Sequence, residues 1–184
     1  MTTTKKRMST QDLVLTGILL AAGTVIKAVF PKLPVTPNFI ISMYCLAVLL
    51  VRPNLMEAIG IGVVSAILAQ LTTGAAVPFI NFAAEPVAIA ACFYLAKIPF
   101  GKGIAGRILR PAFVTFATTF VSGSIFVLIL SAVLLSRGSS AKYVMIYSVV
   151  LPTAAANMVI AALCYAPLRK VLKLSDDDQA KAAA

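Results

Sequence analysis

The sequence predicts an all-α integral membrane protein with six transmembrane helices and both termini in the cytoplasm. Of its 184 residues, 60% are hydrophobic, and its mean hydropathy is +0.98. Its apolar segments approach the length of about 20 residues that crosses a bilayer core. The formal net charge is +10, but the basic residues flank the apolar segments, as topology signals do. They form no single basic patch, so we expect no nucleic-acid partner.

Six apolar segments are expected to form the helices of one membrane domain, which comprises residues 1–184. Proline, glycine and serine residues separate most of these segments, and the second and fourth are short for a span. Residues 1–11 are predicted to be a basic cytoplasmic N-terminus, and residues 173–184 a polar cytoplasmic tail. No small-residue cleavage site follows the first apolar run, so we interpret it as a retained helix. The predicted helices are 12–30, 36–51, 54–73, 83–98, 108–135 and 146–171.

The distribution of basic residues gives the predicted orientation. With six spans, twelve Lys and Arg residues fall on the side of the two termini, and four fall on the opposite side. Cytoplasmic loops of membrane proteins carry the excess of these residues. Both termini are therefore expected in the cytoplasm.

The composition argues against an enzyme and against a metal site. The chain contains no His, which removes His-ligated zinc and Ser-His or Cys-His catalysis. Cys45, Cys92 and Cys164 are dispersed in apolar runs, and we expect small buried thiols rather than a disulfide framework. There is no Walker A motif, so any ATP hydrolysis must belong to partner subunits. We expect no cofactor.

Glu85 is the most informative candidate site residue, because it lies in an otherwise apolar stretch and precedes Pro86. A carboxylate at membrane depth is costly and by default marks a functional site. At a rise of 1.5 Å per residue, it lies roughly 18 Å above the inner hydrocarbon boundary. Asn157 on the last predicted helix lies at about the same depth. Alternatively, Pro86 begins a short helix and leaves Glu85 at a water-exposed helix N-terminus.

Further candidates lie near the predicted outer side. Asn81, Phe79 and Phe82 lie in the third outer connection, just above Glu85. Lys27 either snorkels to the outer interface or binds a substrate carboxylate. Four hydroxyl residues share one face of the fifth predicted helix, where they serve helix packing or line a ligand site: Thr115, Thr118, Thr119 and Ser122.

Two predicted helices carry small residues at spacings that allow close helix approach. In the first these are Gly17, Ala21, Thr24 and Ala28, and in the third Ala58, Gly62, Ser65 and Ala69. Internal packing explains either set. The Gly17/Ala21 pair, in the cytoplasmic half, is also placed for docking of a membrane partner. Asn54 and Glu57 are expected to form a capping box at the start of the third helix.

Several short segments carry a family resemblance. They are Gly17-Ile18-Leu19-Leu20-Ala21, Thr36-Pro37-Asn38, Asn81 with Glu85-Pro86, and Leu151-Pro152 followed by Asn157. With six spans in fewer than 200 residues, the chain resembles the S components of energy-coupling factor transporters, which bind one nutrient for uptake. Within that group it looks closest to the tryptophan-uptake family. This family more often carries a basic residue before the proline, so Glu85 departs from its pattern.

The resemblance implies a multi-pass protein of the bacterial cell membrane that binds tryptophan or a similar aromatic nutrient in its outer half. It adds Asn38 to the candidate substrate-binding residues. It implies that Gly17 and Ala21 dock on an energy-coupling transmembrane subunit, which works with two ATPase subunits. The alternatives are an S component for a thiamine-, flavin- or deazaguanine-type nutrient, an autonomous small transporter, a membrane enzyme and a scaffold.

Overall fold

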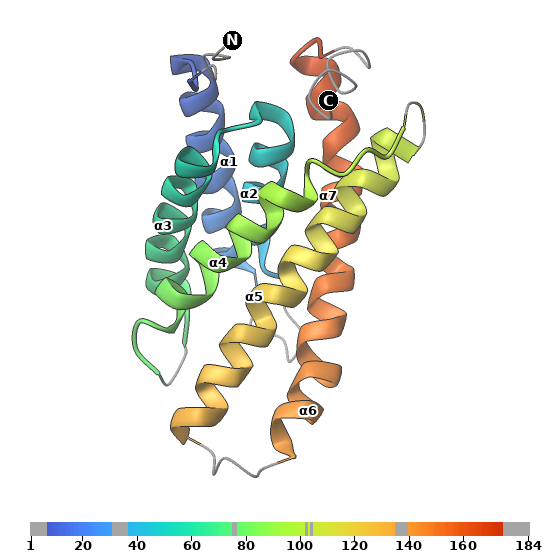
Figure 1. Cartoon of the computed structure of the whole chain (residues 1–184). Helices are drawn as coiled ribbons and strands as arrows, with labels where there is room; N and C mark the ends of the chain where they lie inside the picture. The colour runs from blue at the N-terminus through green and yellow to red at the C-terminus, as the bar shows by residue number, and fades with distance from the viewer. Residues whose placement is uncertain are drawn as a thin grey trace, which may run out of the picture.

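The computed structural model describes residues 7–30, 37–74, 77–101, 103, 105–134 and 140–174, and these residues form a bundle of helices (Figure 1). No strand occurs in the described ranges. The π-helical segment η1 continues into α5, and α6 continues through the π-helical segment η2 into α7, which leaves six rods. The elements are α1 (Thr10–Val29), α2 (Phe39–Val51), α3 (Leu55–Thr72), α4 (Ile80–Leu95), η1 (Ala105–Leu109), α5 (Arg110–Leu134), α6 (Ala141–Met145), η2 (Ile146–Val150) and α7 (Leu151–Val171).

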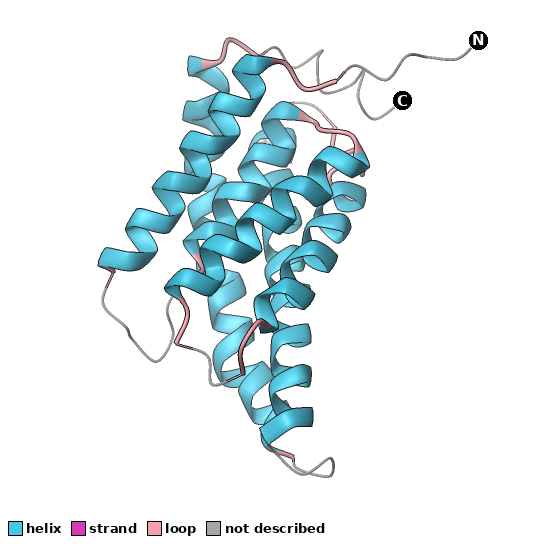
Figure 2. Cartoon of the chain, turned by 90° about the vertical axis from the view of Figure 1, so that its left-hand side faces the viewer, coloured by secondary structure: helices cyan, strands magenta, loops and turns pink. Residues whose placement is uncertain are grey.

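Four of these rods are long and apolar enough to cross a membrane: Thr10–Val29, Leu55–Thr72, Gly106–Leu134 and Ala141–Val171. Phe39–Val51 and Ile80–Leu95 are shorter apolar helices, as the sequence predicted. α1 begins and α7 ends at the upper end of Figure 1, which we call the near end of the bundle. α5 and the rod that contains α7 extend past the other helices at the opposite, far end (Figures 1 and 2).

α2 is the centre of the bundle and contacts α1, α3, α4, α5 and α7. Every residue of α2 from Phe39 to Leu50 is buried, because its sequence is apolar on all sides and such a helix is stable only when surrounded. Cys45 of α2 and Cys92 of α4 lie in this core as free thiols, with their sulfur atoms 3.7 Å apart. No metal-binding group of His, Cys, Asp and Glu occurs among the described residues.

Capping boxes begin two helices at the near end. Asn54 and Glu57 form the predicted box: the Glu57 backbone N–H donates to Asn54 Oδ1 at 3.0 Å, and the Asn54 N–H donates to Glu57 Oε2 at 2.8 Å. Glu57 Oε1 also accepts a hydrogen bond from the Met8 backbone N–H at 3.0 Å. Glu57 therefore joins the start of α3 to the segment before α1. Ser9 and Asp12 form a second box, which begins α1.

The two sets of small residues have different environments. Ala58, Gly62, Ser65 and Ala69 of α3 are all buried. A Cβ atom at Gly62 would lie 2.4 Å from Ile89 of α4, so this set allows close packing of α3 on α4. Gly17 and Ala21 of α1 are instead exposed, and a Cβ atom at Gly17 would meet nothing within 4 Å.

Most predicted boundaries differ from the structure by one to three residues, and two differences affect the placement of the candidate residues. α4 begins at Ile80, three residues earlier than predicted, because Phe79 takes a left-handed conformation (φ 61°) that starts the helix there. Pro86 is therefore inside α4 and not at its first turn. The last rod begins at Ala141 rather than at 146, because α6 and η2 extend it at the far end.

Candidate substrate-binding cavity

A cavity of about 260 Å³ lies at the far end of the bundle. Its lining comes from α1, α2, α4, α5, η2 and α7 and from the segments beside them, so most of the rods contribute to it. Ligand cavities for drug-sized molecules begin at about 300 Å³, so this one suits a compact solute. The exposed surface of its lining is mostly apolar, as is usual for small-molecule sites, although eight of its sixteen lining residues have polar side chains.

Glu85 supplies a carboxyl group to the wall of this cavity. It lies in the second turn of α4, and only 1% of its surface is exposed. The Ser122 hydroxyl of α5 donates a hydrogen bond to Glu85 Oε1 at 3.2 Å. The other oxygen, Oε2, has no hydrogen-bond partner within the described residues. Glu85 is therefore not at a water-exposed helix N-terminus, which was the alternative interpretation of its sequence position.

Tyr44 of the central helix approaches the same carboxyl group and is fully buried. Its hydroxyl makes no hydrogen bond of normal geometry in the described part of the chain. A buried polar atom without a partner costs free energy, and here two such atoms, Tyr44 OH and Glu85 Oε2, lie in one region. Tyr44 is not on the cavity lining, so the unused hydrogen-bonding capacity at the wall is that of Glu85 Oε2.

Lys27 and Glu85 line the cavity from different helices. Lys27 lies near the end of α1 and is half-buried, and its charge attracts that of Glu85. Lys27 therefore lies on the cavity lining, and its binding of a substrate carboxylate stays a prediction. A cation and an acid on one small cavity can together bind a zwitterion.

Two asparagines add amide groups to the same lining. Asn38 precedes α2 at the N-cap position but makes no side-chain capping bond, and its Oδ1 atom has no partner in the ranges described. Asn81 is 6% exposed and donates from Nδ2 to Gln70 Oε1 at 3.0 Å. The cavity therefore brings together four of the seven predicted substrate-binding residues: Lys27, Asn38, Asn81 and Glu85.

Asn157 lies behind the wall of the cavity. It is fully buried on α7 and donates from Nδ2 to Thr119 Oγ1 at 3.1 Å, while Thr119 itself lines the cavity. Thr119 and Ser122 thus connect α5 to α7 and α4 respectively. The hydroxyl face of α5 contributes to packing and to the cavity at the same time.

The two predicted aromatic residues lie away from this lining. Phe79 is 70% and Phe82 is 41% exposed, and their rings pack against each other with centroids 6.1 Å apart. The aromatic side chain on the cavity wall is Phe126 of α5, together with Val127, Met145, Val149 and Val150. Sequence reasoning did not select these residues, because each is an ordinary apolar residue of a membrane helix and only the assembled bundle distinguishes them.

The helices and the cavity together define a multi-pass membrane protein. Its cavity has both polar and apolar lining residues and suits a compact solute. A family model described as "Tryptophan transporter TrpP" matches residues 9–173. The chain belongs to this tryptophan transporter family, which confirms the tryptophan-uptake resemblance. No curated protein matches the chain, and no solved structure matches it.

Proposed function

We propose that this chain is the substrate-binding membrane subunit, or S component, of an energy-coupling factor transporter for tryptophan. The observation that carries the proposal is Glu85, an almost fully buried acid that faces a cavity with one oxygen unpartnered within the described residues. Membership of the tryptophan transporter family supports the choice of solute.

The cavity offers separate groups for the three parts of an amino acid with an aromatic side chain. Glu85 accepts hydrogen bonds from the ammonium group. Lys27, with the amide groups of Asn38 and Asn81, donates to the carboxylate. Phe126 and the aliphatic residues beside it provide an apolar surface for the indole ring, where aromatic contacts contribute about 0.5–1.5 kcal/mol. Lys32 is a further basic residue that could bind the carboxylate, and it lies outside the described residues.

The near end of the bundle provides a surface for the energy-coupling subunit. Gly17 lines a groove of about 520 Å³ between α1 and α3, together with Gly60, Ile61 and Val64. A Cβ atom at either glycine would meet nothing within 4 Å, so another helix can approach the backbone closely there. The exposed Gly17/Ala21 pair is thus better explained by docking than by internal packing.

In this proposal both termini are cytoplasmic and the cavity lies in the outer half of a bacterial cell membrane. The basic residues on the side of the termini support this orientation through the positive-inside rule. Solute then enters from outside, and two ATPase subunits act through the coupling subunit at the cytoplasmic side.

The proposal is tested by purifying the chain in mild detergent from cells that also express energy-coupling subunits. Mass spectrometry of the purified sample should find tryptophan bound and the coupling and ATPase subunits present. Tryptophan without those subunits would instead favour an autonomous transporter. A thiamine-, flavin- or deazaguanine-type compound in place of tryptophan would overturn the choice of solute.

A further inference from the structure

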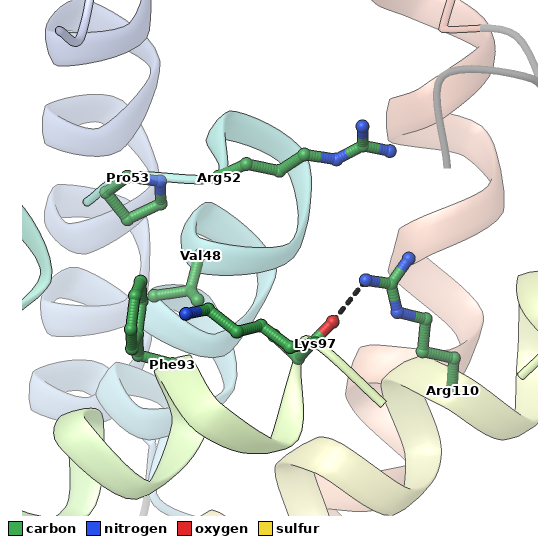
Figure 3. A pocket seen from close by; sticks show the side chains of 7 residues that line it. Val48, Arg52, Pro53, Phe93, Lys97 and Arg110 are labelled. Carbon is green, nitrogen blue, oxygen red and sulfur yellow. Dashed lines mark hydrogen bonds between the residues drawn. The ribbon is translucent and has the colours of Figure 1, made fainter. Parts of the chain in front are cut away.

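A second cavity, of about 190 Å³, lies at the near end of the bundle, opposite the substrate cavity. Three cations line it: Arg52 caps α2, Lys97 follows α4, and Arg110 lies where η1 passes into α5 (Figure 3). Val48, Pro53, Phe93 and Ala96 complete the lining. None of the described acidic residues lies on it.

Arg110 is the buried member of this basic cluster, with 5% of its surface exposed. One terminal nitrogen of its guanidinium donates a hydrogen bond to the Ala96 carbonyl, at the end of α4. Its Nε atom has no hydrogen-bond partner within the described residues. Arg169 of α7 lies near enough to repel Arg110. A buried cation with an unused donor and a like charge nearby is unfavourable unless an anion binds to it.

Arg52 and Lys97 extend the positive charge around the cavity. Figure 3 shows the side chains of Arg52 and Arg110 extending toward one side of the cavity from different helices, while the Lys97 side chain extends the other way, toward Phe93. The Lys97 ammonium lies 4.1 Å from the centre of the Phe93 ring. Arg52 takes a left-handed backbone conformation, with φ 56°. The C-terminal ends of α2 and α4 attract some of this charge through their dipoles. Arg110 lies inside the continuous rod that η1 and α5 form, more than one turn from its start, so no helix end stabilises its charge.

We infer that this basic cavity binds the phosphate-bearing headgroup of an anionic phospholipid from the leaflet at the near end. Guanidinium groups match phosphate oxygens with paired charge-assisted hydrogen bonds. Basic cavities between transmembrane helices on the cytoplasmic side are suited to such headgroups. The apolar lining beside the cations accommodates the glycerol backbone. The inference requires that the chain lies in a bilayer, but it does not depend on tryptophan binding or on an energy-coupling partner.

The test is a titration of the full chain in detergent with phosphatidylglycerol, followed by native mass spectrometry. Phosphatidylcholine, which has a phosphate but no net charge, serves as the comparison lipid. The double variant Arg52→Gln/Lys97→Gln leaves the buried Arg110 in place. Its matched control is Lys170→Gln/Lys173→Gln, which removes the same charge from two exposed residues at the same end of the bundle.

We expect phosphatidylglycerol to bind more tightly than phosphatidylcholine. We also expect phosphatidylglycerol to bind the Arg52/Lys97 variant about tenfold or more weakly, since each basic residue near an anionic headgroup contributes to the attraction. The control should change it less than about twofold. Equal binding of the two lipids, or equal effects of the two double variants, would overturn the site. Displacement of the lipid by millimolar inorganic phosphate would show a soluble phosphate ligand and overturn the lipid as its source.

Discussion

Glu57 and Glu85 are both helical glutamates, but they have different roles because they lie at different positions in the bundle. Glu57 uses both carboxyl oxygens in hydrogen bonds to backbone N–H groups at the near end. Glu85 uses one oxygen, in a bond to Ser122, and turns the group to a cavity. The first carboxylate stabilises a helix start, and we expect the second to accept hydrogen bonds from a ligand's ammonium group.

Glu85→Gln is therefore expected to weaken tryptophan binding at least tenfold. The change removes a desolvated charge-assisted contact, which is worth about 1.5–3 kcal/mol. Isothermal titration of the purified variant measures this effect, with retained helical circular dichroism as the check on folding. Glu57→Gln is the matched control, because it removes the same charge far from the cavity. Unchanged affinity in a folded Glu85→Gln variant would remove Glu85 from the site.

The aromatic residue that contacts the indole ring is also testable. Phe126→Leu should weaken tryptophan binding about two- to tenfold, because an aromatic contact is worth about 0.5–1.5 kcal/mol beyond burial. Phe82→Leu should leave binding almost unchanged, since its side chain is not on the cavity lining. The reverse order of effects in the same titration would mean that the loop aromatics predicted from the sequence form the ring site.

At the scale of elements, α1 and α3 use the same small-residue spacing for different purposes. The spacing was visible in the sequence, but only the structure shows that Gly62 lies against Ile89 while Gly17 lies on an open groove. The reason is that the spacing defines a helix face and does not define what covers that face.

Gly17→Leu should spare tryptophan binding in detergent and impair uptake by cells, because a large side chain blocks close approach of the coupling subunit. Gly62→Ala should instead lower the thermal unfolding temperature, since its new Cβ atom collides with α4 and overpacking costs about 1–3 kcal/mol. Uptake and thermal unfolding of both variants separate the two roles. Wild-type uptake by Gly17→Leu would contradict docking on α1.

At the scale of the whole molecule, hydropathy and turn residues sufficed to predict the all-helical architecture and the helix ranges to within a few residues. The short lengths of α2 and α4 were also predicted from the sequence, because a short apolar segment forms a short helix. The start of α4 was not predicted correctly, since it depends on the backbone conformation of Phe79.

The cavity was predictable only in part. Glu85, Lys27, Asn38 and Asn81 were distinguishable because polar groups are rare in apolar surroundings. Phe126 and its aliphatic neighbours carry no such signal, and their place on the wall depends on the rotation of α5 and on the extension of the last rod. The orientation of the bundle in the membrane and its energy-coupling partners remain predictions.

The most direct test of the central claim is a calorimetric titration of the purified chain with L-tryptophan and with tryptamine, which lacks the carboxylate. We expect tryptophan to bind and tryptamine to bind much less well, because Lys27 and the two asparagines then have no carboxylate to bind. Equal binding of the two compounds, or no binding of tryptophan to the folded chain, would contradict it.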